Sequence, residues 1–272
     1  MNMEPNSHKG LQPVLFGIPF TQLDLKQVCA LLLRPPKPGQ GVRSVVTANV
    51  DHVVRLQSDE RLRSAYAHAW LRTIDGRPLH AYARLLALNV QHVTGADIVP
   101  ELLEGMQPGV HRPFFIISDD VLAAKLRAWG NQRGFSDSAI GTDVPPMGFE
   151  GLADCQEALA AKVCAHRPTH VFMAIGCPRS EIWLDRFRDR LGDVYALSIG
   201  SALAFHVGTL RRAPKFVRSK GLEWLWRVAN EPRRLAKRYF VHSWAFAGVV
   251  FEDLRARRRG ENGIDIGLGP LM

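Results

Sequence analysis

Short apolar runs alternate with segments of helical periodicity along most of the chain. The runs are apolar on both faces, as is typical of strands buried in a parallel sheet. They begin at Arg43, Leu71, Arg112, Thr169 and Val194. Apolar residues recur with helical periodicity in residues 51–70, 95–106, 121–134, 151–167 and 179–191. This alternation predicts an α/β fold with a doubly wound, mostly parallel, Rossmann-like sheet, in which the Pro/Gly-rich residues 34–41 and 141–151 form surface loops.

The pattern changes at both ends of the chain. Residues 1–12 are polar and are expected to be disordered, whereas residues 13–213 carry the alternating pattern and form the predicted α/β core. Residues 214–260 predict a helical, basic appendage, in which Pro232 opens a new helix because proline suits an early helical position. The Gly-rich residues 261–272 are expected to form a flexible tail.

The chain has a formal net charge of +9 and an isoelectric point near 9.8, which favour anionic partners. Most of the excess lies in residues 214–259, where arginine and lysine are interleaved with aromatic residues. This composition predicts contact with an anionic membrane surface; the alternative is an ordinary helix with its aromatics in the core and its charges in water. Nucleic acid would suit the charge but would not explain polar residues at every strand end, so no nucleic-acid partner is expected.

Neither a secretory signal nor a spanning helix is expected. The first residues are polar, and no window reaches the roughly 18–20 apolar residues that a bilayer-spanning helix needs. The chain is therefore expected to be cytoplasmic.

Polar residues and glycines follow the apolar runs, where ligands bind in open parallel sheets. Asp75 suits either a general base or a helix cap, and spacing alone does not separate the two. Thr47 and Asn49 share a face and suit either a sugar pocket or, for Asn49, a cap. Gly76 gives the backbone room to turn. Gly176 and Gly200 would bring backbone N–H groups to a diphosphate if helices start there.

Several other chemistries lack their motifs. The chain has no G-x-G-x-x-G fingerprint, P-loop or nucleophile elbow, and no pair of histidines spaced for zinc on one helix. The four cysteines are scattered and no Asp-x-Asp occurs, so no metal site is expected. Without a metal ion, the negative charge of a departing diphosphate would have to be stabilised by arginine, lysine or helix dipoles. Arg211 and Arg212 suit that role or, equally, a solvated basic loop.

Together these segments resemble the WecG/TagA/CpsF family, glycosyltransferase family 26, from about Phe16 to Tyr239. The residues that carry the resemblance are Thr47-Ala48-Asn49, Asp75-Gly76, Val93-Thr94-Gly95-Ala96-Asp97, the segment 176–183 that begins Gly-Cys-Pro-Arg-Ser-Glu, and the block 208–239 with its Arg-Ala-Pro, Gly-Leu-Glu-Trp-Leu and Glu-Pro-x-Arg elements.

The resemblance implies an inverting transfer from a UDP-sugar donor to an undecaprenyl-diphosphate-linked sugar acceptor, without a metal or other cofactor. It implies a peripheral position on the inner face of the plasma membrane and a role in cell-surface or exopolysaccharide synthesis. The family's catalytic Asp falls on Asp75, and its sugar pocket uses Thr47 and Asn49. The matching motifs add His92, Gly95, Asp97, Pro178, Ser180 and Glu181 to the expected donor and substrate site.

The chain departs from the family pattern at three positions. Ser180 stands where the family commonly has Gln, His92 where it often has Arg, and Ala204 where it has Asp. These changes leave the donor sugar, the acceptor and the linkage open, and they motivate an alternative, a non-catalytic scaffold in a polysaccharide assembly complex. The sequence also leaves open whether the chain forms a homo-oligomer.

Overall fold

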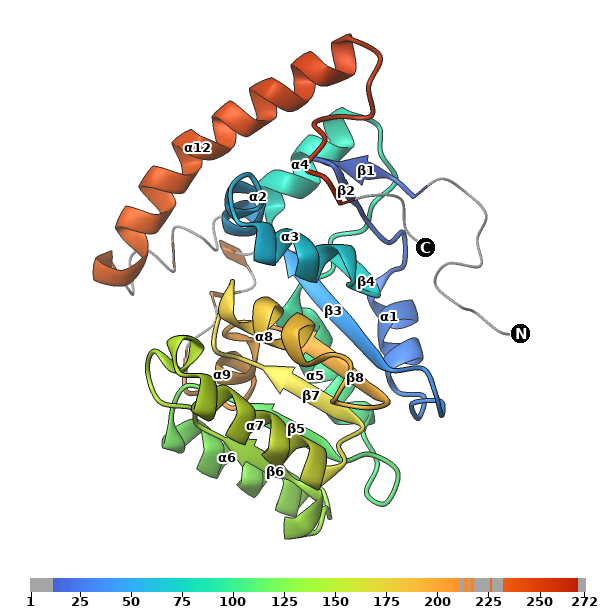
Figure 1. Cartoon of the computed structure of the whole chain (residues 1–272), viewed down its shortest axis with the longest axis vertical. Coiled ribbons are helices and arrows are strands. Elements are labelled where there is room, and N and C mark those ends of the chain that lie inside the picture. The colour runs from blue at the N-terminus through green and yellow to red at the C-terminus, as the bar shows by residue number, and fades with distance from the viewer. Residues whose placement is uncertain (1–11, 211–212, 215, 218–225, 227–231, 269–272) are drawn as a thin grey trace.

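The computed structural model of the chain describes residues 12–210, 213–214, 216–217, 226 and 232–268 (Figure 1). Its main sheet has six strands, and every neighbouring pair is parallel. In order across the sheet they are β4 (Leu71–Ile74), β3 (Val42–Ala48), β8 (Val194–Ser198), β7 (His170–Met173), β5 (Pro113–Ile116) and β6 (Gly141–Asp143). The predicted α/β fold with a parallel sheet is confirmed.

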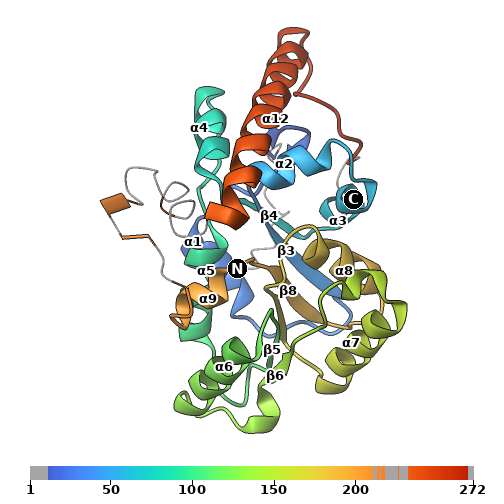
Figure 2. The same ribbon diagram turned by 90° about the vertical axis from the view of Figure 1, so that its left-hand side faces the viewer.

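Helices cover both faces of the sheet, as Figure 2 shows. One face packs against α1 (Leu25–Leu32), α5 (Gly95–Gly105), α6 (Asp120–Gln132) and α9 (Ala202–His206). The other packs against α2 (Val50–Leu56), α3 (Glu60–Ala67), α7 (Ala153–His166) and α8 (Arg179–Phe187). Successive strand residues point to opposite faces, so Val45 joins the first core and Val46 the second. This explains why the strands are apolar on both sides.

The structure corrects two expectations and adds elements that were not predicted. Residues 141–151, expected to be a loop, contain the edge strand β6 and the short helix η2 (Phe149–Gly151). Residues 51–70 form two helices, because Asp59 caps a new helix at α3. The elements that were not predicted include helices α1, α9 and α4 (Arg77–Leu85) and the antiparallel pair β1 (Val14–Leu15) and β2 (Ile18–Pro19). The expected loop at 34–41 is confirmed between α1 and β3.

Helix α12 (Pro232–Arg258) begins at Pro232, as predicted, and lies against α2 (Figure 1). Its Val249 is 7% exposed and belongs to the same hydrophobic cluster as the β1–β2 hairpin. The Phe246 and Phe16 ring centroids lie 5.5 Å apart. Among the described residues, none of the helices combines the length and apolar character that crossing a membrane requires.

A buried carboxylate fastens α12 to the rest of the fold. Asp253 is fully buried and accepts hydrogen bonds from the Tyr82 hydroxyl (2.8 Å), Arg257 Nε (2.8 Å) and the Ile264 amide (3.0 Å). Arg257 also donates to the Val14 carbonyl at 2.7 Å. We call these residues, Asp253 with Tyr82, Arg257, Ile264 and Val14, the Asp253 latch. Within the tail, Ile266 is 7% exposed, and the last four residues lie outside the described part of the chain.

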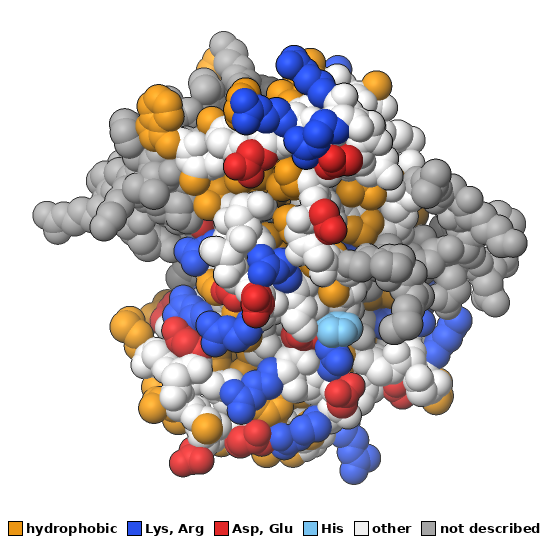
Figure 3. All heavy atoms as spheres, turned by 45° about the horizontal axis from the view of Figure 1, so that its top comes forward, with side chains coloured by type: hydrophobic (Ala, Val, Ile, Leu, Met, Phe, Trp, Pro, Cys, Tyr) orange, Lys and Arg blue, Asp and Glu red, His pale blue; other side chains and the backbone are white. Residues whose placement is uncertain are grey.

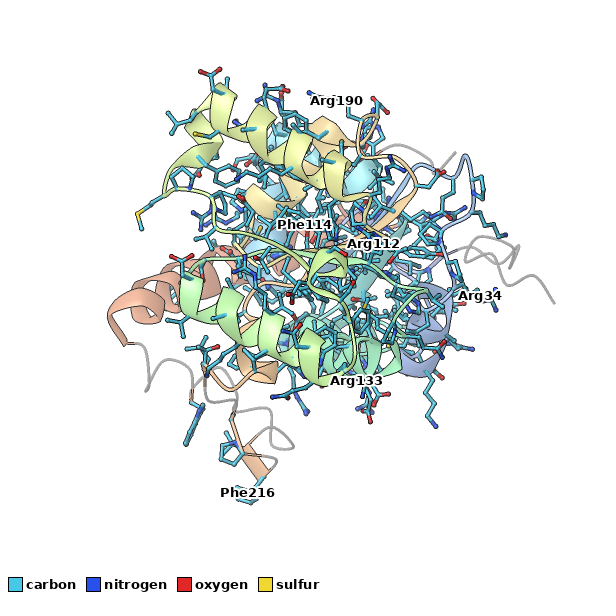
Figure 4. All side chains as sticks on the ribbon, turned by 90° about the horizontal axis from the view of Figure 1, so that it is seen from below. Arg34, Arg112, Phe114, Arg133, Arg190 and Phe216 are labelled. Carbon is cyan, nitrogen blue, oxygen red and sulfur yellow. The ribbon has the colours of Figure 1, made fainter. Side chains whose placement is uncertain are left out.

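Exposed apolar side chains accompany basic ones on the surface of α12. Trp244 and Phe251 are 75% and 54% exposed, and Arg255 lies over the Phe251 ring at 4.2 Å from its centroid. Leu85, at the end of α4, is 76% exposed. Figure 3 shows basic, acidic and apolar side chains interspersed on the upper face of the molecule. Phe216, at 65% exposure, stands away from the core in Figure 4.

Some of the positive charge serves the fold itself. Arg112 donates to the His166 carbonyl at the end of α7 (3.0 Å), and Arg133 donates to the Glu104 carbonyl in the last turn of α5 (both arginines are labelled in Figure 4). Cationic side chains stabilise the negative ends of helices. These arginines therefore contribute to the net charge without requiring an anionic partner.

Candidate active site

The carboxyl ends of β3 and β4 meet at one edge of the sheet. The amides of Asp75 and Gly76 both point to the Ala48 carbonyl, at 2.8 and 3.3 Å. A Cβ atom at Gly76 would lie 3.2 Å from the Asn49 Cα and 3.4 Å from its Cβ. Glycine at position 76 therefore lets the β4–α4 turn approach the β3–α2 turn closely, and this approach brings Asp75 beside Asn49.

The structure places Asp75 one residue outside the capping position of α4. The N-cap of α4 is Gly76, and no side chain caps this helix from that position. Asp75 stands one residue earlier, half-buried, at the carboxyl edge of the sheet. Its position is thus that of a strand-end carboxylate rather than of the helix cap.

Asn49 and Thr47 are both tied into the fold. Asn49 is the N-cap of α2, where its Oδ1 accepts from the amides of Asp51 (2.9 Å) and His52 (3.4 Å). The capping interpretation of Asn49 is confirmed, although the cap uses only Oδ1 and leaves the amide group to donate elsewhere. Thr47 is 4% exposed, and its hydroxyl donates to the Ser198 carbonyl of β8 at 3.3 Å.

His92 lies directly beside Asp75. Its Nε2 is 2.8 Å from the Asp75 carbonyl oxygen, and since a carbonyl only accepts, Nε2 carries the proton. Burial lowers the pKa of His92 below its ordinary value, and the neighbouring His80, with ring centroids 5.4 Å apart, acts in the same direction. The ring is therefore neutral near pH 7, so His92 does not supply the positive charge of the arginine that the family often has here.

Helix α5 starts at the same edge of the sheet. Its N-cap is Thr94, whose hydroxyl donates to the Asp97 carboxylate at 2.7 Å and accepts from the Asp97 amide at 3.1 Å. A Cβ atom at Gly95 would lie 3.2 Å from the Ile199 carbonyl oxygen, just after β8. The Val-Thr-Gly-Ala-Asp motif thus caps α5 and packs its first turn against β8.

The β7–α8 turn completes the edge. Gly176 has φ +87°, which favours glycine, and the Cys177–Pro178 peptide bond is cis. Helix α8 begins at Arg179 without a side-chain cap at Pro178. Ser180 and Glu181 in its first turn are only 1% and 4% exposed. These two side chains therefore lie behind the turn rather than on its outer surface.

A group of polar side chains lies buried behind this edge. His52 Nδ1 is 2.6 Å from the Tyr66 hydroxyl. Ligand-type atoms of His52, Cys177 and Glu181 all lie within 4.8 Å of one another, and the described residues offer no other such group of metal-ligand types. We call His52, Tyr66, Cys177 and Glu181 the buried cluster.

Burial also shifts the titration of the buried cluster. It raises the pKa of Tyr66 well above its ordinary value, with the nearby Cys177 and Glu181 acting in the same direction. It raises the pKa of Glu181 to about 7; Asp51 adds to this, whereas the Glu181 amide, Ser198 and Cys177 oppose it. Glu181 is therefore close to half-protonated at neutral pH.

Most of the predicted site residues are brought together. Those at or directly behind the carboxyl edge are Thr47, Asn49, Asp75, Gly76, His92, Gly95, Asp97, Gly176, Pro178, Ser180, Glu181 and, after β8 with φ +53°, Gly200. Arg211 and Arg212 lie outside the described residues. His52 and Tyr66 were not predicted from the sequence, because they carry no motif of their own and reach the site only through the packing of α2 and α3.

The fold and this edge together define a Rossmann-like α/β protein with its polar site at the carboxyl ends of parallel strands. The profile of the glycosyl transferase WecG/TagA/CpsF family matches residues 13–260, and the chain belongs to that family. It is also similar to the N-acetylglucosaminyldiphosphoundecaprenol N-acetyl-beta-D-mannosaminyltransferase of Bacillus spizizenii, at 23% identity over 219 residues that cover 78% of this chain and 81% of the relative. The family resemblance inferred from the motifs is confirmed.

Proposed function

We propose that the chain is an inverting hexosyltransferase that moves a sugar from a UDP-sugar donor to a sugar carried on a polyprenyl (undecaprenyl) diphosphate, for a cell-surface or exported polysaccharide. The observation that carries the proposal is the half-buried Asp75 carboxylate at the edge where β3, β4 and β8 end. The name of the Bacillus spizizenii relative supports this class of acceptor. Neither comparison favours a non-catalytic scaffold.

In the proposed reaction Asp75 is the general base. Its carboxylate takes the proton from the acceptor hydroxyl while that oxygen forms a bond to the anomeric carbon of the donor sugar. The bond from this carbon to the UDP oxygen breaks on the opposite face, and UDP leaves with the electron pair. A single displacement inverts the configuration, and the base contributes roughly 10²–10⁴-fold in rate.

The remaining edge residues suit donor binding. The Asn49 amide group is directed by its cap and is free to donate to a sugar oxygen. The Gly176 turn lies at the same edge and suits a close backbone approach to a diphosphate. Because His92 is neutral near pH 7, the charge of the departing diphosphate is assigned to Arg211 and Arg212. No metal ion or other cofactor is required in this scheme.

Release of UDP tests the proposal. Wild type is incubated with a panel of UDP-sugars and a polyprenyl-diphosphate-sugar acceptor, with and without EDTA. We expect one donor to release UDP in both conditions and Asp75→Asn to lose roughly 10²–10⁴-fold in rate. Asp59→Asn is the matched control, because asparagine also caps α3 well. Wild-type turnover in Asp75→Asn would exclude the assigned base.

The proposed acceptor is lipid-linked, so we also propose that α12 and the end of α4 contact an anionic membrane. Leu85, Trp244 and Phe251 supply exposed apolar side chains, and Arg255 lies over the Phe251 ring. Each basic side chain near an anionic leaflet contributes about 1 kcal/mol, which salt screens. This contact gives the catalytic edge access to an acceptor whose lipid stays in the bilayer.

A further inference from the structure

Helix α4 leads from the candidate active site to the proposed membrane contact. It begins at Arg77, two residues after Asp75, and ends at Leu85, which is 76% exposed. Figure 2 shows α4 and α12 extending beyond the sheet at the same end of the molecule. An acceptor whose lipid stays in the bilayer and whose sugar reaches Asp75 therefore has α4 beside it.

One side of α4 carries two arginines. Arg77 and Arg84 are seven residues apart, close to two helical turns, so they lie on the same side of the helix, about 10 Å apart along its axis. Both are exposed, and Ala81, which lies between them on this side, is exposed and small. We call the side of α4 with Arg77, Ala81 and Arg84 the α4 face. It presents two cationic groups with only a methyl group between them.

The described part of the chain leaves the charge of the α4 face without an acidic partner. Residues 76–96 contain neither aspartate nor glutamate. Among the residues that the structure describes, no carboxylate forms an ion pair with Arg77 or Arg84. Burial lowers the pKa of the neighbouring His80, as do Arg84 and Arg77, so this histidine is neutral near pH 7. The two arginines therefore carry the charge of the α4 face.

The proposed acceptor carries a group that matches this charge. A guanidinium group presents paired N–H donors that fit two oxygens of one phosphate. In the acceptor, a sugar lies between the hydroxyl that reacts and the diphosphate, and the lipid follows the diphosphate. With the hydroxyl at Asp75 and the lipid toward Leu85, the diphosphate falls between them, where Arg77 and Arg84 stand.

We propose that the α4 face binds the diphosphate of the lipid-linked acceptor, with Arg77 and Arg84 donating to its phosphate oxygens. The identity of the acceptor rests on the proposed transferase function. The donor diphosphate is assigned elsewhere, because the Gly176 turn follows β7 in the interior of the sheet, whereas α4 follows the edge strand β4. The two diphosphates thus approach Asp75 from different sides.

Binding of farnesyl diphosphate, a soluble prenyl diphosphate, tests the α4 face without any transfer. Calorimetric titration of the full chain compares wild type with Arg77→Gln, Arg84→Gln and the double variant. We expect each single variant to bind about tenfold more weakly, as for the loss of one charge-assisted contact, and Arg77→Lys to lose less than Arg77→Gln. Arg127→Gln is the matched control, because it removes an exposed arginine from α6, at the other end of the molecule from α4 (Figure 1).

Three results would overturn the proposal. The first is wild-type affinity for farnesyl diphosphate in the double variant. The second is an equal loss in Arg127→Gln, which would show attraction by net charge alone. The third comes from titrating UDP into the same variants: a loss of UDP affinity as large as that for farnesyl diphosphate would assign the α4 face to the donor.

Kinetics test the link to transfer. With a polyprenyl-diphosphate-sugar acceptor, we expect the acceptor KM of Arg77→Gln and Arg84→Gln to rise about tenfold, while the donor KM stays at its wild-type value. A rise in the donor KM alone would overturn the assignment to the acceptor. Absence of UDP release from any donor, with weaker farnesyl diphosphate binding in the variants, would refute the transferase function and still support a prenyl-diphosphate site on α4.

Discussion

Replacing Glu181 with glutamine should change how the free energy of unfolding depends on pH. Burial raises the pKa of Glu181 from 4.5 to about 7 in the folded chain. Between these values the folded state keeps a proton that the unfolded state releases, so stability falls as pH rises. The contribution of the protonated group is complete below about pH 4.5, is lost progressively up to about pH 7, and stays lost above it.

The size of the effect follows from the same two values. One pKa unit corresponds to about 1.4 kcal/mol, so the contribution of Glu181 falls by roughly 2 kcal/mol between pH 5.5 and pH 8. Glutamine has no proton to lose. The difference in unfolding free energy between Glu181→Gln and wild type should therefore shift by that amount in favour of the variant.

Urea titrations at pH 5.5 and pH 8 measure the difference directly. Glu157→Gln serves as the control because its side chain is exposed and pairs with Arg190 at the surface, where single changes are usually within about 0.5 kcal/mol. If the difference between wild type and Glu181→Gln is the same at both pH values within that margin, the pKa of Glu181 is not raised and the reasoning fails.

Three further predictions concern the latch, the edge of the sheet and the surface. Asp253→Ala should lower the free energy of unfolding in urea by about 3 kcal/mol, because it leaves buried donors of Tyr82 and Arg257 without their acceptor. Gly95→Ala should lower it by about 1 kcal/mol, because the new Cβ meets the Ile199 carbonyl at 3.2 Å. Trp244→Ser should reduce sedimentation with anionic vesicles several-fold, because it removes the most exposed aromatic side chain described on α12.

Each of these predictions has a result that would contradict it, and two have a matched control variant. Asp265→Ala removes an exposed carboxylate that bonds only locally, and equal losses in both variants would contradict the role of the latch. If the urea midpoint of unfolding is the same in Gly95→Ala and wild type, the contact between α5 and β8 accommodates the added Cβ atom and the prediction is wrong. Met147→Ser removes a 98% exposed side chain far from α12 in sequence; a reduction of vesicle binding equal to that of Trp244→Ser would refute a specific membrane face.

Much of the fold could be predicted because short apolar runs in the sequence indicate buried parallel strands. The five longer strands were predicted, but β6 was not, since its three residues, Gly-Thr-Asp, read as part of a loop. The β1–β2 hairpin was missed for the same reason: two residues per strand are too few for periodicity. Local pattern fails where pairing with a neighbour, rather than propensity, makes the strand.

The candidate site was predicted in position and only partly in arrangement. Parallel strands gather their carboxyl ends at one edge, so Asp75 and Asn49 could be expected to lie together without coordinates. The burial of Glu181 and its contacts with His52 could not, because these residues are far apart in sequence and their distance depends on how α2 and α8 pack. The sequence also did not show which residue stands at the N-cap of α4. In the structure this residue is Gly76.

The Asp253 latch has a consequence for synthesis of the chain. Arg257 bonds Val14, 243 positions earlier in sequence, and Asp253 holds the Ile264 amide. The ribosome synthesises the chain from its N-terminus. The apolar side of the β1–β2 hairpin, which is made early, is therefore covered only after α12 has been synthesised. We therefore expect nascent chains that stop before residue 250 to be held by chaperones.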